Sequence, residues 1–371
     1  MWTTPAGVRV FEPTLREVEA FVPLFDEIVW MGYEWKTQAP ASARVDRTGR
    51  IQCVPFPNGH GGSSWLSKLK ILPGIPRLFF RILSRRRRAN VVHTRGPSVP
   101  ALMAIALSGF DRSRIYWHKF AGNWVQERPP LSYAIQRYLL QRITCHKVTV
   151  NGAWDEAHPN ILCFENPCFA EAELQSAATI AGGKSYDGKL SLLFVGRMEY
   201  EKGPQRIIDA LQLSVLSELS SHIGEICFVG DGKDFKAIAA LAEKLRVPHR
   251  IVGSCDRAKL NEFYRQSHLF LLPTTASEGF PKVIAEACAF GCLPIVSDVS
   301  SITHYVKHCE NGLILKQNTP DEIAGYLKDL ILDRVRLRQL ASKAVEIAGL
   351  YTYERYNSRV RDEILRLQVR S

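Results

Sequence analysis

A stretch near residue 280 places two carboxylates around the predicted start of a helix. The sequence there reads Ser277-Glu-Gly-Phe-Pro-Lys-Val-Ile-Ala-Glu286. Pro281 suits the first turn of a helix, because its missing N–H would have no partner there, and Gly291 suits the position just past the end. Such a helix start offers N–H groups and a positive dipole end to an anion such as a diphosphate. Glu278 and Glu286 could then accept hydrogen bonds from hydroxyls on either side of it. Alternatively, Glu278 caps the helix and Glu286 is a surface residue.

A second loop carries two cations after a predicted strand. Arg197 and Lys202 follow the apolar run 190–196, at the carboxyl end of that strand. Both side chains can therefore reach the place at the carboxyl ends of the strands where ligands of such sheets bind. Arg suits fork-like contacts with a phosphate, and Lys acts as a point charge. The alternative is a surface ion-pair cluster of these two residues with Glu199 and Glu201.

The loops that carry these residues must be positioned by the surrounding strands and helices, which alternate along the chain. In the second half, apolar runs predict strands at 190–196, 225–232 with its glycine turn, 250–253, 267–273, 293–297 and 312–315. In the first half, the predicted strands are 8–11, 27–30, 90–93, 114–117 and 146–150, with helices at 102–107 and 131–142. Continuous apolar strands separated by helices indicate parallel sheets covered on both faces. The predicted fold class is therefore α/β, with doubly wound parallel sheets.

The length of 371 residues corresponds to about two domains. Asn166-Pro167 and Gly182-Gly183 interrupt the pattern between the two halves. We expect Rossmann-like domains at 1–170 and 171–351, and a C-terminal helix at 352–371 that packs back on the N-terminal domain. Two such domains would face one another across a cleft at the carboxyl ends of their strands, where ligands of this architecture bind.

The C-terminal half resembles family 4 glycosyltransferases, which are retaining, metal-independent enzymes with the GT-B fold. The resemblance rests on Glu278 and Glu286, separated by seven residues, and on three further segments in the family's order. These segments are Leu193–Gly203 with its Arg and Lys, the turn Val229–Gly232 and the closing strand Asn311–Leu315.

The resemblance implies that the C-terminal domain binds a nucleoside-diphosphate sugar. Arg197 and Lys202 would contact the diphosphate. Glu278 would bind hydroxyls of the donor sugar as a catalytic residue, and Glu286 would bind the ribose. The whole expected donor site comprises Gly196, Arg197, Lys202, Gly253, Ser254, Glu278, Gly279, Phe280, Pro281, Lys282, Val283 and Glu286. The backbone at 253–254 would flank the base, and neither a metal ion nor a cofactor is expected.

The N-terminal half is expected to bind the acceptor. His118, within Arg114–Trp124, would lie just after a strand and face the cleft. Family members often carry a histidine after a comparable strand, so the resemblance makes His118 a second catalytic candidate. The alternative is a structural histidine. Lys119, Asn123 and Arg95 are weaker candidates for the same cleft.

Two segments depart from the family's pattern. Thr4–Gly7, the only early candidate for its glycine-rich loop, precedes the first predicted strand instead of following it. Ser300–His304 stands where the family has glycines and an acid. These departures concern contacts with the acceptor and the donor sugar and leave the expected nucleotide site unchanged.

The formal net charge of +11 predicts an anionic partner. Residues 65–88 mix Trp, Leu, Ile and Phe with Lys and Arg and end in four arginines, Arg85 to Arg88. This composition is typical of a segment at an anionic membrane surface. The alternative is a core-facing helix with a solvated basic end. No nucleic-acid-binding motif occurs, so nucleic acid is not expected as a partner.

The remaining features favour a cytoplasmic protein. The nine cysteines form no CxxC pair, which is typical of reduced, mostly buried thiols. No run approaches the roughly 18 apolar residues of a membrane span, and the start lacks the pattern of a secretory signal. Localisation at the inner face of the membrane would then be peripheral.

We therefore expect a retaining glycosyltransferase of the hexosyltransferase type. It would move a sugar from a UDP- or GDP-sugar to a glycan or lipid-linked acceptor, in the synthesis of cell-surface polysaccharide or glycolipid. One alternative is a nucleotide-sugar epimerase or a glycosyl phosphorylase on the same fold. Another is a non-catalytic basic module that binds membrane or nucleic acid.

Overall fold

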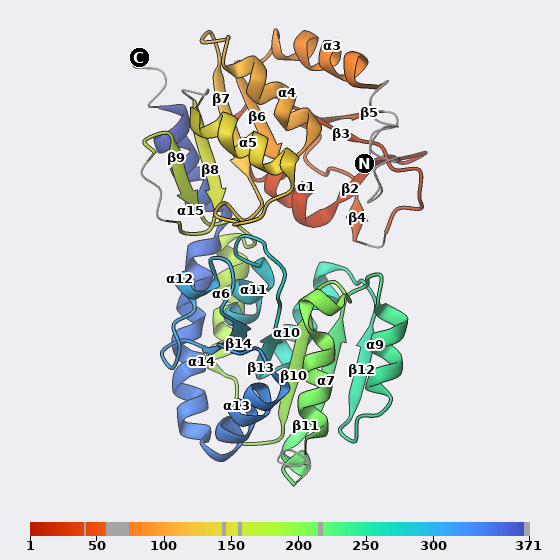
Figure 1. Ribbon diagram of the computed structural model, residues 1–371, viewed down its shortest axis with the longest axis vertical. Coiled ribbons are helices and arrows are strands. Elements are labelled where there is room, and N and C mark those ends of the chain that lie inside the picture. Colours follow the sequence, from red (N-terminus) through yellow and green to blue (C-terminus); the bar gives the residue numbers. More distant parts are fainter. Residues whose placement is uncertain (41, 57–73, 143–145, 155–157, 214–217, 367–371) are drawn as a thin grey trace. The chain divides into compact units, whose positions relative to one another are not determined.

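A computed structural model describes residues 1–40, 42–56, 74–142, 146–154, 158–213 and 218–366. The chain forms two compact units (Figure 1). Unit 1 contains Met1–Phe164 and Glu354–Ser371, and unit 2 contains Glu165–Tyr353. Each unit is an α/β structure built on parallel strands, which confirms the expected fold class.

Unit 2 is built on a six-stranded parallel sheet with the strand order β12-β11-β10-β13-β14-β15. The strands are β10 (Leu190–Val195), β11 (Ile223–Val229), β12 (His249–Val252), β13 (Leu269–Leu272), β14 (Leu293–Ser297) and β15 (Leu313–Leu315). Every apolar run predicted as a strand in the second half forms one of them. Their side chains are mostly buried on both faces, because helices cover the sheet on either side.

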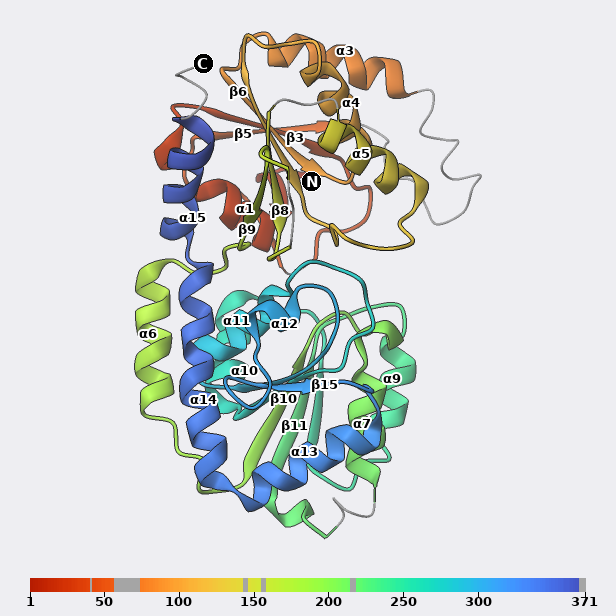
Figure 2. The same cartoon turned by 60° about the vertical axis from the view of Figure 1, so that its left-hand side comes forward.

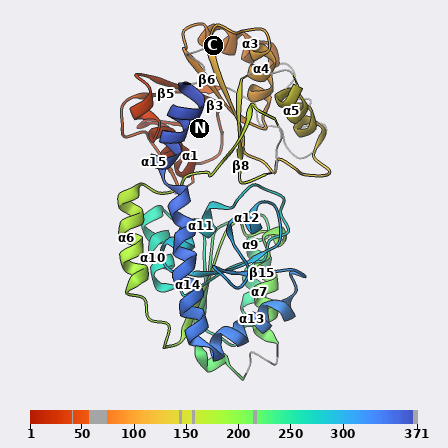
Figure 3. The ribbon, with the colours of Figure 1, turned by 90° about the vertical axis from the view of Figure 1, so that its left-hand side faces the viewer.

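Two helix layers cover this sheet (Figure 1). One layer contains α7 (Pro204–Gln212), α9 (Phe235–Ala242) and α13 (Pro320–Leu332). The other contains α6 (Glu171–Gly182), α10 (Arg257–Gln266), α11 (Lys282–Ala289) and α14 (Arg334–Ala348). Figures 2 and 3 show α6 and α14 side by side in this second layer. The short α12 (Ile302–Tyr305) follows β14.

Unit 1 contains a four-stranded parallel sheet and a separate parallel pair of strands. The sheet consists of β6 (Val91–Gly96), β7 (Ile115–Phe120), β8 (Lys147–Asn151) and β9 (Ile161–Phe164), and the pair consists of β3 (Ile28–Tyr33) and β5 (Ile51–Phe56). The helices α3 (Ile75–Arg86), α4 (Val99–Ser108) and α5 (Leu131–Arg142) pack in sequence, and α4 contacts β6 and β7.

The first predicted strand, 8–11, does not belong to a parallel sheet. It forms β2 (Gly7–Phe11), which pairs antiparallel with β1 (Trp2–Thr4) and β4 (Ala43–Arg44), just before α1 (Glu12–Glu19). The segment Thr4–Gly7 is the turn of the β1–β2 hairpin, where Gly7 has a φ of +113°. It is therefore not a loop at the carboxyl end of a parallel strand, because a two-residue turn can join only antiparallel neighbours.

The end of the chain packs on the sheet of unit 1. Tyr356 of α15 (Tyr353–Arg359) and Val360 and Ile364 of the following helical turn are buried against Trp117 and Phe164. On the opposite face of the sheet, α4 and α5 cover the apolar side chains of β8. The terminal segment thus completes the second face of this sheet.

The boundary between the units differs slightly from the expected one. Phe169 and Thr352 form a β-bridge. Beside it, the Cys168 amide donates to the Tyr351 carbonyl at 2.9 Å, and the Tyr353 amide donates to the Phe169 carbonyl at 2.8 Å. Residues 165–169 therefore belong to unit 2 with residues 351–353. The units divide after residues 164 and 353 instead of after residues 170 and 351.

Candidate functional site

The strand order of unit 2 reverses between β10 and β13. Ligands of open parallel sheets bind outside the carboxyl ends of the strands at such a reversal. The loop after β10 contains Arg197 and Lys202, and the loop after β13 leads through Glu278 into α11. The topology therefore brings the two groups predicted from the sequence to the same edge of one sheet.

Glycines allow the loops at this edge to approach one another closely. Gly203 has a φ of +85°, and a Cβ there would lie 2.1 Å from the carbonyl oxygen of Pro273. Gly230, in the turn after β11, has a φ of +136°, and its Cβ would lie 1.9 Å from the carbonyl oxygen of Gly196. A side chain at either position would push the β10 loop away from its neighbours.

Lys202 and Glu278 meet between these loops. The Nζ atom of Lys202 donates a hydrogen bond to Oε1 of Glu278. The Thr275 amide donates to the Glu201 carbonyl at 2.7 Å, and the Glu278 amide donates to Oγ of Ser300 at 3.1 Å. The Lys202 side chain is 9% exposed and that of Glu278 is 37% exposed. The structure thus joins two residues that the sequence assigned separately to ligand contacts.

This ion pair determines what a ligand meets at the sheet edge. An anion has to compete with the Glu278 carboxylate for the Lys202 ammonium, whereas a hydroxyl group can donate to the other lone pairs of the carboxylate. The alternative role of Glu278 as a helix cap is wrong, because Pro281 occupies the N-cap position of α11 and no side chain caps that helix.

Arg197 points into solvent at the same edge. Its side chain is 62% exposed and its Nη1 lies 2.8 Å from the Glu199 carboxylate. Part of the alternative interpretation, a surface pair with Glu199, therefore describes this structure. Because the guanidinium carries five N–H donors, the pair leaves donors for a phosphate.

Glu286 is buried and is not a surface residue. It lies on α11, its side chain is 10% exposed, and its Oε1 lies 2.6 Å from Nη1 of Arg257. The hydroxyl of Tyr264 donates to Oε2 at 3.0 Å. The surface alternative for Glu286 is therefore wrong, and the carboxylate has fixed donors on its protein side.

The other residues expected to bind the nucleoside-diphosphate sugar fall into two groups. Gly253 and Ser254 follow β12, where Gly253 has open space around its Cα and Ser254 is exposed. In the β13 loop and the first turn of α11, Gly279, Phe280 and Pro281 are buried, and Lys282 and Val283 are partly buried. The Phe280 ring stacks on Tyr351 at 4.8 Å, so its side chain belongs to the core of unit 2.

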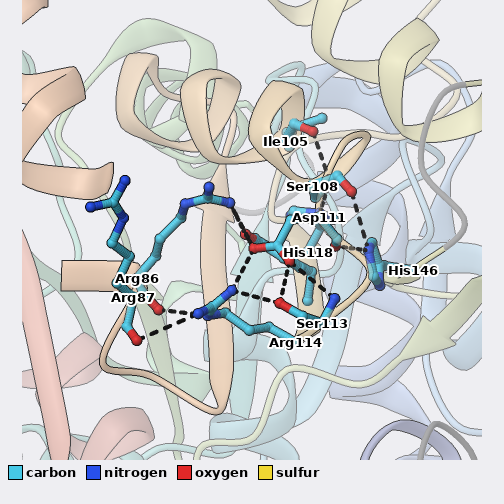
Figure 4. Close-up of polar contacts among 10 residues, drawn as sticks. Arg86, Arg87, Ile105, Ser108, Asp111, Ser113, Arg114, His118 and His146 are labelled. Carbon is cyan, nitrogen blue, oxygen red and sulfur yellow. Dashed lines mark hydrogen bonds and ion pairs between the residues drawn. The ribbon is translucent and has the colours of Figure 1, made fainter. Parts of the chain in front are cut away.

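His118 lies inside β7, not after it, and is fully buried (Figure 4). Oγ of Ser108 donates to the Ile105 carbonyl, so it accepts from Nε2–H of His118 at 3.1 Å. The Nδ1 atom then accepts from Oγ1 of Thr94 at 2.9 Å. Burial lowers the pKa of His118 to about 3. Both ring nitrogens are thus engaged within unit 1, which corrects the expected placement and favours the structural interpretation.

The weaker candidates near His118 are also engaged. Lys119 is buried and donates to the Glu17 carboxylate, to which Nη1 of Arg95 lies at 2.9 Å. Oδ1 of Asn123 accepts from the amide of Val125 at 3.1 Å. Lys119 and Arg95 therefore balance a buried carboxylate of α1, a function that the sequence analysis did not foresee.

The basic segment 65–88 is described from residue 74 onward; residues 65–73 lie outside the described residues. Leu78 is buried in unit 1, and Nη1 of Arg86 lies 2.7 Å from the Asp111 carboxylate, which Arg114 also contacts (Figure 4). Leu78 and Arg86 are therefore structural, so the expectation of a membrane-facing segment does not hold for these two residues.

Two residues enter the site that the sequence analysis did not assign to it. Ser300 has a φ of +57° and supports the Glu278 amide, so the departure at Ser300–His304 still contributes a contact. Arg257 begins α10 and reaches Glu286, 29 residues further along the chain. No spacing rule connects two helices that are separated by a strand, so only the three-dimensional structure reveals this pair.

Within the described ranges, no three His, Cys, Asp or Glu side chains are grouped as metal ligands. None of the described helices combines the length and the apolar character needed to cross a bilayer.

Residues 177–347, almost all of unit 2, match the family model of glycosyl transferases group 1. An uncharacterized glycosyltransferase of Haemophilus influenzae is 27% identical over 269 residues, which cover 68% of this chain and 69% of that protein. Another, of Methanocaldococcus jannaschii, is 30% identical over 149 residues, which cover 40% of this chain. The chain spans only 37% of the length of the latter relative.

The solved structure of the Anabaena protein Alr3699/HepE in complex with UDP and glucose superposes over 96% of both chains, with a TM-score of 0.70 and 16% identity. The fold is GT-B. In this GT-B protein, the segment that matches group 1 contains Lys202, Glu278 and Glu286, at the sheet edge where the strand order reverses.

Proposed function

We propose that this protein transfers a sugar from a nucleoside-diphosphate sugar to a glycan or lipid-linked acceptor. The observation that carries the proposal is the meeting of Lys202 and Glu278 at the strand reversal of a GT-B unit. A cation and a carboxylate side by side suit a ligand that joins an anionic diphosphate to a sugar rich in hydroxyls. The match of this unit to group 1 glycosyl transferases supports the same function.

In this proposal, each group has a distinct part in the transfer. The Glu278 carboxylate accepts hydrogen bonds from hydroxyls of the donor sugar and orients its anomeric carbon. Lys202 and Arg197 contact the diphosphate and offset the negative charge that develops when it departs. Glu286 binds the ribose. The N-terminal end of α11 adds backbone donors to the anion. We propose that the transfer proceeds with retention and without a metal ion.

Nucleotide binding and turnover test this proposal directly. The thermal unfolding temperature should rise when a UDP- or GDP-sugar is added, because a ligand that binds only the folded state stabilises it. UDP is the first nucleotide to test, because the Anabaena protein of the same fold was solved with it. Nucleoside diphosphate should be released only when an acceptor is present, and excess EDTA should leave the rate unchanged. Binding of neither nucleotide sugar would contradict the proposal.

The same assay separates the transferase from the enzymes considered as alternatives. An epimerase would convert the donor sugar without releasing nucleoside diphosphate. A phosphorylase would require inorganic phosphate and a glycan in place of a nucleotide sugar. Acceptor-dependent release of UDP or GDP is expected of the transferase alone.

We also propose that unit 1 associates peripherally with anionic membranes. One side of α3 is exposed and carries Arg77, Phe80, Arg81 and Arg85, and Arg88 follows the helix. Phe80 is 65% exposed, so an apolar ring stands among the cations. Each cation near an anionic surface contributes roughly 1 kcal/mol, which salt screens. Vesicle sedimentation should show binding to anionic but not neutral vesicles, weakened by salt and by Arg81→Ser with Arg85→Ser. Equal binding to neutral vesicles would contradict it.

A further inference from the structure

A largely buried cation, Arg257, forms an ion pair with Glu286. Arg257 is the first residue of α10, and Glu286 lies on α11 in the same helix layer (Figure 1). Arg257 Nη1 lies 2.6 Å from Glu286 Oε1, and the hydroxyl of the fully buried Tyr264 lies 3.0 Å from Oε2. Each carboxylate oxygen therefore has one fixed donor and keeps a lone pair for a further one.

The Arg257 guanidinium is held in place by an aromatic ring as well as by its ion pair with Glu286. It lies over the ring of Phe169, 5.2 Å from the centroid, and its side chain is 17% exposed. Its Nε and Nη2 atoms are buried and have no hydrogen-bond partner among the described residues. Burial lowers the pKa of Arg257, but the nearby Glu286 carboxylate outweighs this effect and raises it.

Burying a guanidinium with two unused nitrogens is unfavourable, and an apolar residue of similar volume would avoid that cost. The arrangement does, however, fix the orientation of Glu286, because each of its oxygens has a defined donor. The remaining lone pair on each oxygen can then accept a hydrogen bond from one of the two vicinal hydroxyls of a ribose. A 2′-deoxynucleotide lacks one of these two hydroxyls, the one on C2′.

We propose that Arg257 is a positioning residue that, together with Tyr264, holds the Glu286 carboxylate in one orientation, aimed at the ribose of the nucleotide. The inference rests on the proposed function, in which Glu286 faces the ribose. It adds a specificity: the site selects ribonucleoside diphosphates over their 2′-deoxy analogues through a residue that acts by orienting Glu286. Such discrimination arises because a buried acceptor is left unpaired when the hydroxyl is missing.

The test compares dissociation constants of UDP and 2′-deoxy-UDP, or of the GDP pair if GDP binds more tightly. Wild-type protein should prefer the ribonucleotide at least about tenfold. Arg257→Met should weaken UDP binding until the two constants are nearly equal, while 2′-deoxy-UDP binding stays close to wild type. Tyr264→Phe removes only a hydroxyl and should reduce the preference part of the way. Arg250→Met, which removes an exposed arginine paired with Glu225, is the matched control and should keep the full preference.

The outcomes separate this inference from the function on which it rests. If Arg257→Met and Tyr264→Phe weaken both nucleotides equally, or leave the preference intact, their role is structural and the inference is overturned. If Glu286→Gln abolishes the preference while those two variants keep it, the ribose role of Glu286 stands and only the positioning role fails. If wild-type protein binds neither UDP nor GDP, the proposed function itself fails. Should Arg257→Met not fold, Tyr264→Phe alone decides.

Discussion

At the scale of single residues, unit 2 holds its candidate ligand groups in ion pairs. Lys202 contacts Glu278, Arg197 contacts Glu199, and Arg257 contacts Glu286. These three pairs differ in burial, which determines their roles. The exposed Arg197 pair contributes little to stability because solvent screens it. The more buried pairs fix the positions of the carboxylates that the proposed donor would meet.

Removing the carboxylate at the strand reversal should abolish activity without unfolding the protein. Glu278 lies in a loop and its side chain is 37% exposed, so Glu278→Ala is expected to leave the unfolding temperature nearly unchanged. Loss of one positioned polar contact at a reacting centre typically lowers the rate on the order of 10²–10³-fold. Initial rates of nucleoside-diphosphate release measure the effect. A turnover close to that of wild type would remove Glu278 from the proposed machinery.

Removing one or the other partner of the Lys202–Glu278 ion pair should change the binding of the free nucleoside diphosphate in opposite directions. In Glu278→Gln, the Lys202 ammonium no longer has to leave a carboxylate, so UDP or GDP without the sugar should bind more tightly than to wild type. Lys202→Met should weaken the binding of the same nucleoside diphosphate, because a phosphate-binding cation is lost. Isothermal titration calorimetry of both variants measures these two changes in affinity. If both variants bind the nucleotide as wild type does, the diphosphate lies elsewhere.

At the scale of the elements, the candidate site depends on backbone packing between loops that follow different strands. The β11 turn touches the β10 loop so closely that only a glycine fits at position 230. The β13 loop is tied to the β10 loop through the Thr275 amide. These contacts explain how residues of the β10 loop keep a fixed distance from α11.

A single methyl group should therefore disturb this edge of the sheet. Gly230→Ala would bring a Cβ to within 1.9 Å of the Gly196 carbonyl at a φ of +136°, so the β10 loop has to move. We expect a loss of stability of roughly 1–3 kcal/mol together with weaker nucleotide binding. Gly325→Ala is the control, because that glycine lies in α13 with nothing within 4 Å, and alanine there should be neutral or slightly stabilising. Equal effects of the two substitutions in urea unfolding would contradict this account.

At the scale of the whole molecule, each unit contains a histidine whose pKa is lowered by burial. Burial lowers the pKa of His118 in unit 1 to about 3 and that of His268 in unit 2 to about 4. In the unfolded chain, each histidine has a pKa near 6.5. The unfolded state therefore binds more protons than the folded state between these values.

The free energy of unfolding should consequently fall as the pH falls from about 6.5 toward 4. The slope is up to about 1.4 kcal/mol per pH unit for each such histidine. The sign follows from the lowered pKa values, because protonation favours the unfolded chain. Urea unfolding at pH 7, 6 and 5 measures the slope. His268→Gln, which removes the titrating group of unit 2, should reduce it, and an unchanged slope would show that His268 is not responsible.

The sequence alone determined the α/β class, the six strands of unit 2 and the loops that carry Arg197, Lys202 and Glu278. These features are local: apolar runs, glycine turns and a helix start lie within a few residues of one another, so their patterns are visible along the chain. The prediction failed where the signal was not local. His118 lies within a strand with both nitrogens engaged, and residues 8–11 form a hairpin, because burial and pairing depend on distant partners. Only the tertiary structure placed Arg257 against Glu286, since contact between two helices of one layer depends on how both pack on the sheet.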